Sequence, residues 1–193
     1  TDWASVLPPE NCSYILGNPP FLGKSNQSAA QKTDMQAVCG DIKNAGLLDF
    51  VSAWYIKAAR YMGFGRSDDS SRTALSRSLT APTISCAFVS TNSITQGEQV
   101  GVLWGWMLAQ GIKIHFAHRT FSWSNEARGK AAVHCVIIGF GLQDVPDKTI
   151  YEYADIKGEP HAVKASNINP YLVDALDLVL PDRGFPISKV PDI

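Results

Sequence analysis

Hydrophobic runs along the chain predict a series of strands separated by polar segments. Residues 12–17, 83–90 and 131–140 are short apolar runs bounded by Gly, Pro or polar turn residues, which is typical of buried strands. Residues 112–118 alternate between apolar and polar positions, which predicts a further strand. Residues 149–153 suggest one more short strand near the end of the chain.

Apolar side chains at helical spacing predict two amphipathic helices. The first begins near Leu47 and ends before Gly63, and the second covers residues 98–109. The polar segments 24–46 and 63–82 are expected to be long loops, the first with room for one helical turn.

The order strand, helix, strand, helix, strand, strand is typical of an α/β domain with a mostly parallel sheet. The last two strands of this series are joined without a helix. We therefore expect an antiparallel hairpin at one edge of the sheet, formed by residues 112–118 and 131–140.

Composition and charge narrow the possible functions. The chain has 193 residues, of which 45% are hydrophobic, so it can form a packed core and is not a disordered segment. It has 17 basic and 18 acidic residues, and this balance excludes a chain whose whole surface attracts nucleic acid. Any DNA contact must therefore be local or made elsewhere. No apolar run is long enough to span a membrane, so no membrane partner is expected.

The four cysteines lack the spacings of a metal site, and the four histidines fall in no zinc pattern. We expect no metal and reduced thiols, as in a cytoplasmic protein. The cysteines are Cys12, Cys39, Cys86 and Cys135.

The sequence Asn18-Pro19-Pro20-Phe21 carries the main chemical signal, because it directly follows a predicted buried strand. Open α/β sheets bind ligands at the carboxyl ends of their strands. The Asn18 side-chain oxygen and the Pro19 carbonyl can together accept both hydrogens of an amino group. The nitrogen lone pair then stays free to attack a methyl group, while Phe21 can stack on a planar ring. The competing interpretation is a structural Asn-Pro turn.

Residues 14–21 resemble the catalytic motif of class I adenine-specific DNA methyltransferases. The segments that follow resemble this family in the same order. The sequence of residues 88–99 is most similar to that of large fused restriction–modification enzymes. These further segments are residues 48–59, 87–94, 121–127 and 131–140. The resemblance implies a partial Rossmann-like methyltransferase sheet, mostly parallel with a final antiparallel strand.

The resemblance also implies roles for particular residues. Asn18, Pro19, Pro20 and Phe21 would hold a flipped adenine of double-stranded DNA, since a base inside a duplex cannot reach a methyl donor. Phe121 or Trp123, in an expected loop over residues 119–124, would cover the other face of the base. Core packing remains an alternative for each of these three aromatic residues.

Polar residues around the motif are further candidates. Lys24 and Arg119, with Arg128 and Lys130, could form a basic rim that contacts phosphates, or they could be solvated surface. Asp49 could join Asn18 in binding the cofactor, or it could stabilise the start of a helix through its charge.

One histidine and one glycine-containing segment are not expected to take part in the chemistry. His134 lies in an apolar strand and is interpreted as a core histidine. Gly63-Phe64-Gly65 follows a helix and not a strand, so it cannot serve as a cofactor loop.

In this family the S-adenosylmethionine-binding strand and its Gly-rich loop precede the catalytic motif by many residues. We therefore expect residues 1–143 to be the carboxyl half of a methyltransferase domain and residues 144–193 to begin a linker or DNA-recognition region. The missing amino-terminal half would carry the main S-adenosylmethionine loop, so the chain alone should bind the cofactor weakly and be inactive. The strand at 12–17 should then present an apolar sheet edge.

Two other functions are compatible with the residues. The same chemistry would serve methylation of a protein glutamine or of RNA, and the tetrapeptide could also be incidental in a non-enzymatic α/β module. The aromatic residues of 121–123 favour a flipped base over an amide.

Overall fold

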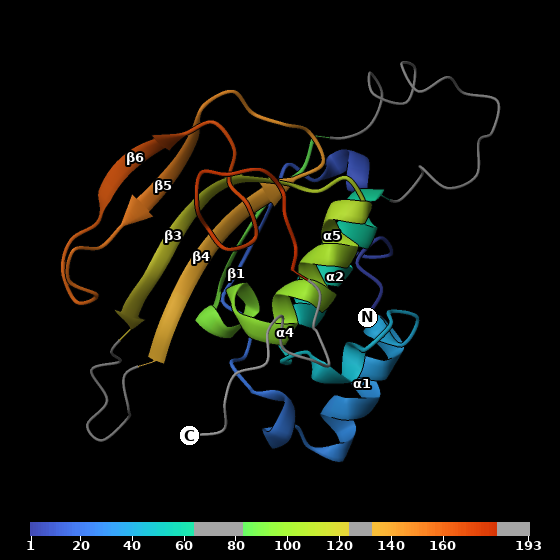
Figure 1. Cartoon of the computed structure of the whole chain (residues 1–193). Coiled ribbons are helices and arrows are strands. Elements are labelled where there is room, and N and C mark those ends of the chain that lie inside the picture. The colour runs from blue at the N-terminus through green and yellow to red at the C-terminus, as the bar shows by residue number, and fades with distance from the viewer. Residues whose placement is uncertain (64–82, 124–132, 181–193) are drawn as a thin grey trace, which may run out of the picture.

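The computed structural model describes residues 1–63, 83–123 and 133–180, and a six-stranded sheet forms its centre (Figure 1). The strand order across the sheet is β1-β2-β4-β3-β5-β6. The strands are β1 (Tyr14–Gly17), β2 (Ser85–Thr91), β3 (Lys113–Trp123), β4 (Val133–Gly141), β5 (Lys148–Glu152) and β6 (His161–Ala165).

Four of the six strands run in one direction. β1 is parallel to β2 and β3 is parallel to β5, while β4 is antiparallel to both of its neighbours and β6 is antiparallel to β5. The predicted α/β class and the antiparallel pairing of β3 with β4 are confirmed. The predicted position of this pair at an edge is wrong, because β4 lies between β2 and β3. Most of β4 is buried, and such an apolar strand is more stable inside a sheet than at its rim.

Helices lie on one side of the sheet (Figure 1). They are α1 (Ala29–Cys39), α2 (Ser52–Gly63) and a continuous helical segment made of α4 (Gly97–Gln99), the π-helical stretch η5 (Val100–Trp104) and α5 (Gly105–Ala109). One of them, α1, packs on the helix α2. Short 3-10 turns are η1 (Pro9–Asn11), η2 (Lys24–Asn26), η3 (Ala45–Leu47) and η4 (Asn92–Thr95).

A cluster of buried aromatic rings fixes these helices on the sheet. The ring of Tyr55 in α2 lies 5.2 Å from those of Phe88 and Phe140, and 5.9 Å from that of Trp104, between ring centroids. The Tyr55 hydroxyl is 2.8 Å from Ser90 Oγ, and Trp104 Nε1 donates to the carbonyl of Ile94 at 3.0 Å. Both polar groups therefore remain hydrogen-bonded inside an apolar core.

The first predicted loop contains a full helix, α1. Its start is a capping box: Gln31 N donates to Ser28 Oγ at 3.3 Å, and Ser28 N donates to Gln31 Oε1 at 2.9 Å. Only Met35 and Cys39 of α1 are buried, so its apolar periodicity is too weak to reveal a helix. The loop predicted at 63–82 lies, apart from Gly63, outside the described residues.

Two other differences concern the ends of elements. α2 begins at Ser52 and not near Leu47, because residue Leu48 is extended. Residues 119–123, expected in a loop, continue β3 by pairing with β4, where Ser122 lies opposite His134. The short strand expected at 149–153 is β5, and its exposed partner β6 was not predicted.

Two further expectations concern the whole chain. All four cysteines are free thiols, as predicted, and three of them are buried. Within the described ranges, none of the helices has the length and apolar character needed to cross a membrane.

Candidate functional site

The Asn18-Pro19-Pro20-Phe21 motif leaves the sheet at the carboxyl end of β1, as the sequence predicts. The last residue of β1, Gly17, lies opposite Phe88 of β2 in parallel register. A Cβ at this position would approach two carbons of the Phe88 ring to 3.2 and 3.3 Å. Glycine therefore lets the chain pass close over a buried ring immediately before the motif.

The motif alternates between exposed and buried positions. Asn18 and Pro20 are exposed, Pro19 is buried and Phe21 is half-buried. Within the described residues, no hydrogen bond occupies the Asn18 side-chain amide. Its oxygen is therefore accessible to an external amino group, and the Phe21 ring is not enclosed in the core.

The chain after the motif is held by the carboxylate of Asp49, which is only 7% exposed. Asp49 Oδ1 accepts a hydrogen bond from Lys24 N at 2.8 Å, and Oδ2 accepts one from Ser93 Oγ at 2.7 Å. Asp49 precedes α2, which has no acidic residue in its first turn. Because Ser52 N donates to the Asp49 carbonyl at 3.0 Å, the carboxylate still lies at the start of α2, and the helix-charge interpretation stays a prediction beside this hydrogen-bonded role.

Two further hydrogen bonds, one of them donated by a side chain, reinforce this connection. Phe50 N donates to the carbonyl of Leu22 at 2.9 Å, and Gln27 Nε2 donates to the carbonyl of Leu48 at 3.1 Å. The segment between η3 and α2 thus runs beside the chain that follows Phe21 and holds it at several points.

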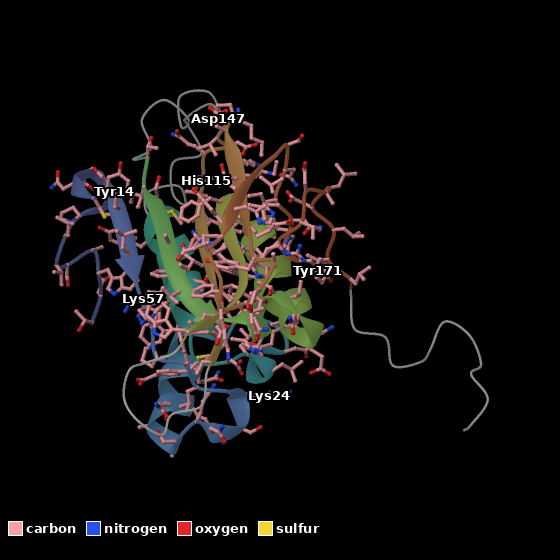
Figure 2. All side chains as sticks on the ribbon, turned by 90° about the vertical axis from the view of Figure 1, so that its left-hand side faces the viewer. Tyr14, Lys24, Lys57, His115, Asp147 and Tyr171 are labelled. Atoms are coloured by element: carbon pink, nitrogen blue, oxygen red, sulfur yellow. The ribbon has the colours of Figure 1, made fainter. Side chains whose placement is uncertain are left out.

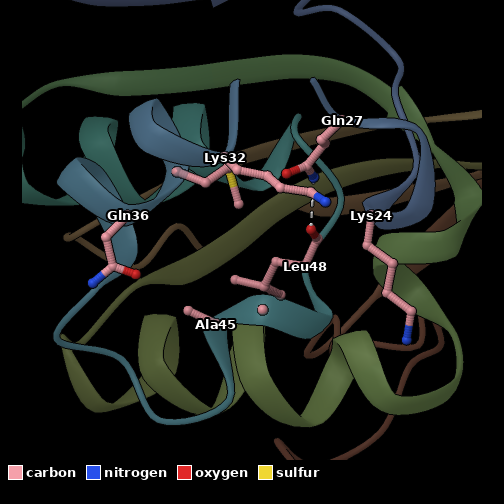
Figure 3. Close-up of a pocket in the computed structure, with 8 residues that line it drawn as sticks. Lys24, Gln27, Lys32, Gln36, Ala45 and Leu48 are labelled. Carbon is pink, nitrogen blue, oxygen red and sulfur yellow. Dashed lines mark hydrogen bonds between the residues drawn. The ribbon is translucent and has the colours of Figure 1, made fainter. Parts of the chain in front are cut away.

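A cavity of about 310 Å³ opens between this chain, α1 and η3 (Figure 3). Two lysines, Lys24 and Lys32, stand on its wall and are exposed. Lys24 Nζ lies 3.5 Å from Glu98 Oε2. In Figure 2, Lys24 lies beyond the carboxyl end of β1, and Tyr14 marks the opposite end of that strand. The cavity therefore lies beyond the carboxyl end of β1, as the motif does.

The aromatic candidates Phe121 and Trp123 lie near the carboxyl end of β3, at the same end of the strands as the motif. Two strands separate β1 from β3, so the axes of β1 and β3 are three interstrand spacings, or about 14 Å, apart. Phe121 is half-buried, and its ring centroid is 5.4 Å from that of Tyr153 and 6.2 Å from that of Trp123. Trp123 is 38% exposed. Phe121 thus packs within the domain, and Trp123 presents more of its ring to solvent.

Other predicted residues have definite positions. Arg119 is exposed, and its Nη1 lies 3.0 Å from Glu152 Oε1, so its charge is partly balanced. Arg128 and Lys130 lie outside the described residues. The prediction that His134 is a core histidine is wrong, because its side chain is exposed. β2 pairs with β4 only as far as Cys135, so His134 has a neighbouring strand, β3, on one side only.

Sequence reasoning missed an aromatic cluster on the face of the sheet away from α2. The His118 ring stacks on Tyr151 at 4.2 Å between centroids, and His118 Nδ1 is 2.8 Å from the Tyr153 hydroxyl. Burial lowers the pKa of His118. The parallel pairing of β3 with β5 creates this cluster, and only the tyrosines at alternate positions of 149–153 hinted at it.

The lateral edge of the sheet that β1 forms is apolar. β1 is the outer strand, and the side chains of Tyr14 and Leu16 are 72% and 74% exposed. A shallow cavity of about 330 Å³ lies beside them, lined also by Val6 and Leu7. The apolar edge expected from the sequence is therefore present.

The fold and the motif together define an α/β domain with an accessible Asn-Pro-Pro-Phe turn at the carboxyl ends of its parallel strands and a reversed strand, β4, between β2 and β3. The chain belongs to the family described as the DNA-methyltransferase domain of MmeI, whose model matches residues 1–152.

Two relatives support this assignment. The chain is 37% identical over 194 aligned residues to DNA methyltransferase A of Bacillus subtilis (strain 168), covering 100% of the chain and 20% of that protein. It is 56% identical to the type IIL restriction–modification enzyme MmeI, whose structure was solved in complex with DNA. That match has a TM-score of 0.86 and covers 99% of the chain and 23% of the enzyme. The chain thus spans about a fifth of the length of these relatives.

Proposed function

We propose that the chain is the carboxyl half of the methyltransferase domain of a restriction–modification polypeptide, and that this domain methylates the amino group of adenine in double-stranded DNA. The observation that carries the proposal is the accessible Asn18 amide, which has no hydrogen-bond partner among the described residues and directly follows β1. Family membership supports DNA methylation.

The residues of the motif bind and orient the base that receives the methyl group. Asn18 Oδ1 and the Pro19 carbonyl accept the two amino hydrogens of a flipped adenine, Pro20 stiffens the turn, and Phe21 stacks on the base. When bound, S-adenosylmethionine would supply an electrophilic methyl group. The amine that Asn18 and Pro19 hold would form the carbon–nitrogen bond as the carbon–sulfur bond breaks, and it would then lose a proton to solvent. No general base among the described residues is needed for this order of events.

Other residues bind the flanking groups. Trp123 or Phe121 covers the second face of the base, and Lys24 and Arg119 contact backbone phosphates near it. Asn18 faces the methyl donor as well as the base. Asp49 shapes the donor-side wall through the chain that it holds.

The main S-adenosylmethionine loop belongs to an amino-terminal half that packs on the apolar edge formed by Tyr14 and Leu16. Residues 144–193 lead from the methyltransferase domain toward a DNA-recognition region, although β5 and β6 still extend the sheet.

Transfer of a labelled methyl group to duplex DNA by the longer polypeptide tests the proposal. Asn18→Ala should abolish transfer without unfolding the protein, whereas Asn11→Ala, an exposed asparagine before β1, should leave it unchanged. Label in a protein glutamine or in RNA, and not in adenine, would identify one of the alternative substrates. Equal activity of both variants would refute the assigned role of Asn18.

Calorimetric titration of the chain alone provides a second test. We expect weak or undetectable binding of S-adenosylmethionine, because the main cofactor loop is proposed to lie elsewhere. Micromolar affinity would contradict that division of the site.

A further inference from the structure

One buried carboxylate joins three parts of the chain that are distant in sequence. Asp49 accepts hydrogen bonds from Lys24 N, beyond the motif, and from Ser93 Oγ, in η4. Its own backbone N–H donates to Gln99 Oε1 of α4 at 3.0 Å. Ser93 Oγ is also 2.9 Å from Thr91 Oγ1, at the end of β2. The turn after β1 and the turn after β2 are therefore connected through this side chain.

The connection bears on the motif because the intervening chain is short and stiff. Pro19 and Pro20 each have a fixed φ angle, so the turn between Gly17 and Leu22 has few soft torsions. One end of this turn continues β1, and the other is fixed by Leu22 and Lys24. The carboxylate also lies directly against the chain between Phe21 and Lys24, because a Cβ built on Gly23 would be 3.6 Å from Asp49 Oδ1.

We propose that Asp49 is a positioning residue for methyl transfer: its carboxylate fixes the chain after the motif and so sets the place of Phe21 against the target base. This inference rests on the proposed function, but the hydrogen-bond connection can be tested without it. Within the described residues no cation pairs with Asp49, so neutral N–H and O–H donors satisfy the carboxylate.

This donor set predicts which replacement preserves the connection. In Asp49→Asn, the amide oxygen can still accept from Lys24 N, and the amide nitrogen can donate to Ser93 Oγ. The Ser93 hydrogen can then turn to Thr91 Oγ1. In Asp49→Ala both acceptors are lost, and Lys24 N is left without its partner. Asp49→Asn should therefore keep most of the hydrogen-bond connection between Lys24 and Ser93 that Asp49→Ala loses.

Amide hydrogen exchange of the chain measures the connection directly. We expect the Lys24 amide to exchange at least about tenfold faster in Asp49→Ala than in the unmodified chain, and much less so in Asp49→Asn. Core amides of β4 report on global unfolding. Asp34→Ala, which removes an exposed carboxylate of α1, is the matched control. It should change neither the exchange of the Lys24 amide nor that of the β4 core amides. Unchanged exchange at Lys24 in Asp49→Ala would overturn the inference.

Kinetics of the longer polypeptide separate positioning from simple stability. Asp49→Ala should lower kcat about 100-fold, since small misplacements of reacting groups have effects of this size, while KM for DNA stays within about twofold. Faster exchange with an unchanged kcat would reduce Asp49 to a structural residue and overturn the proposal.

Failure of the proposed function and failure of the inference about Asp49 give different results. If the unmodified polypeptide transfers no methyl group, the proposed function fails, while the exchange result still decides whether Asp49 holds Lys24. If Asp49→Ala does not fold, Ser93→Ala removes only one of the two side-chain bonds. It should then raise exchange at Lys24 and lower kcat to a smaller extent, and an unchanged Ser93→Ala would overturn the proposal.

Discussion

Replacing Tyr55 by phenylalanine isolates one buried hydrogen bond that fixes α2, the helix after Asp49. Tyr55 and Ser90 are both fully buried, and the two hydroxyl oxygens are 2.8 Å apart. Tyr55→Phe keeps the ring that packs on Phe88, Phe140 and Trp104, but it leaves Ser90 Oγ without its partner. A buried polar group left unpaired costs about 1–3 kcal/mol. We therefore expect the free energy of unfolding to fall by about 2 kcal/mol.

A double-mutant cycle with urea unfolding measures this bond. Ser90→Ala should be similarly destabilising because it leaves the Tyr55 hydroxyl unpaired. The combined variant should be clearly less destabilised than the sum of the two, since both polar atoms are gone. A loss of about 2 kcal/mol corresponds to a drop in Tm of roughly 4–8 °C for a chain of this size. Strict additivity of the two single variants would refute the assignment of the bond.

Three further predictions concern other parts of the domain. Ser52 is buried, and its hydroxyl has no hydrogen-bond partner among the described residues, so Ser52→Ala should raise stability by up to about 1 kcal/mol in thermal unfolding. Burial lowers the pKa of His118 below its ordinary value of 6.5, so the unfolded chain binds more protons and stability should fall as pH drops through 6.5. His118→Phe keeps the stacked ring and should make Tm less dependent on pH between about 5 and 7, and an unchanged dependence would exclude this histidine as the cause. The exposed Tyr14 and Leu16 should promote self-association of the isolated chain, which sedimentation should detect and Leu16→Lys should reduce; a monomer at high concentration would contradict this.

Local pattern was sufficient for most elements and for the motif. β2 and β4 are apolar because neighbouring elements bury most of their residues, and that requirement is visible in any short stretch of sequence. β1 has a similar apolar pattern, although its Tyr14 and Leu16 are exposed. The position of Asn18 after a strand could be predicted for the same reason, since Gly17 and the two prolines act on the backbone locally.

Elements with weak apolar patterns could not be predicted in this way. α1 depends on the capping box between Ser28 and Gln31 more than on a buried face. The extension of β3 to Trp123 depends on pairing with β4, whose residues are distant in the chain. His134 belongs to an apolar run but lies beyond the end of β2, so its exposure follows from register alone.

The sequence by itself determined the class of the fold, the order of its first five strands along the chain and the tetrapeptide that carries the chemistry, because each of these depends on short-range periodicity and backbone stiffness. Only the tertiary structure decided that β4 enters the middle of the sheet and that Asp49 joins Lys24, Ser93 and Gln99. The partners of Asp49 lie 25, 44 and 50 residues away from it. Contacts at such separations are set by which faces pack together, and no local pattern records that choice.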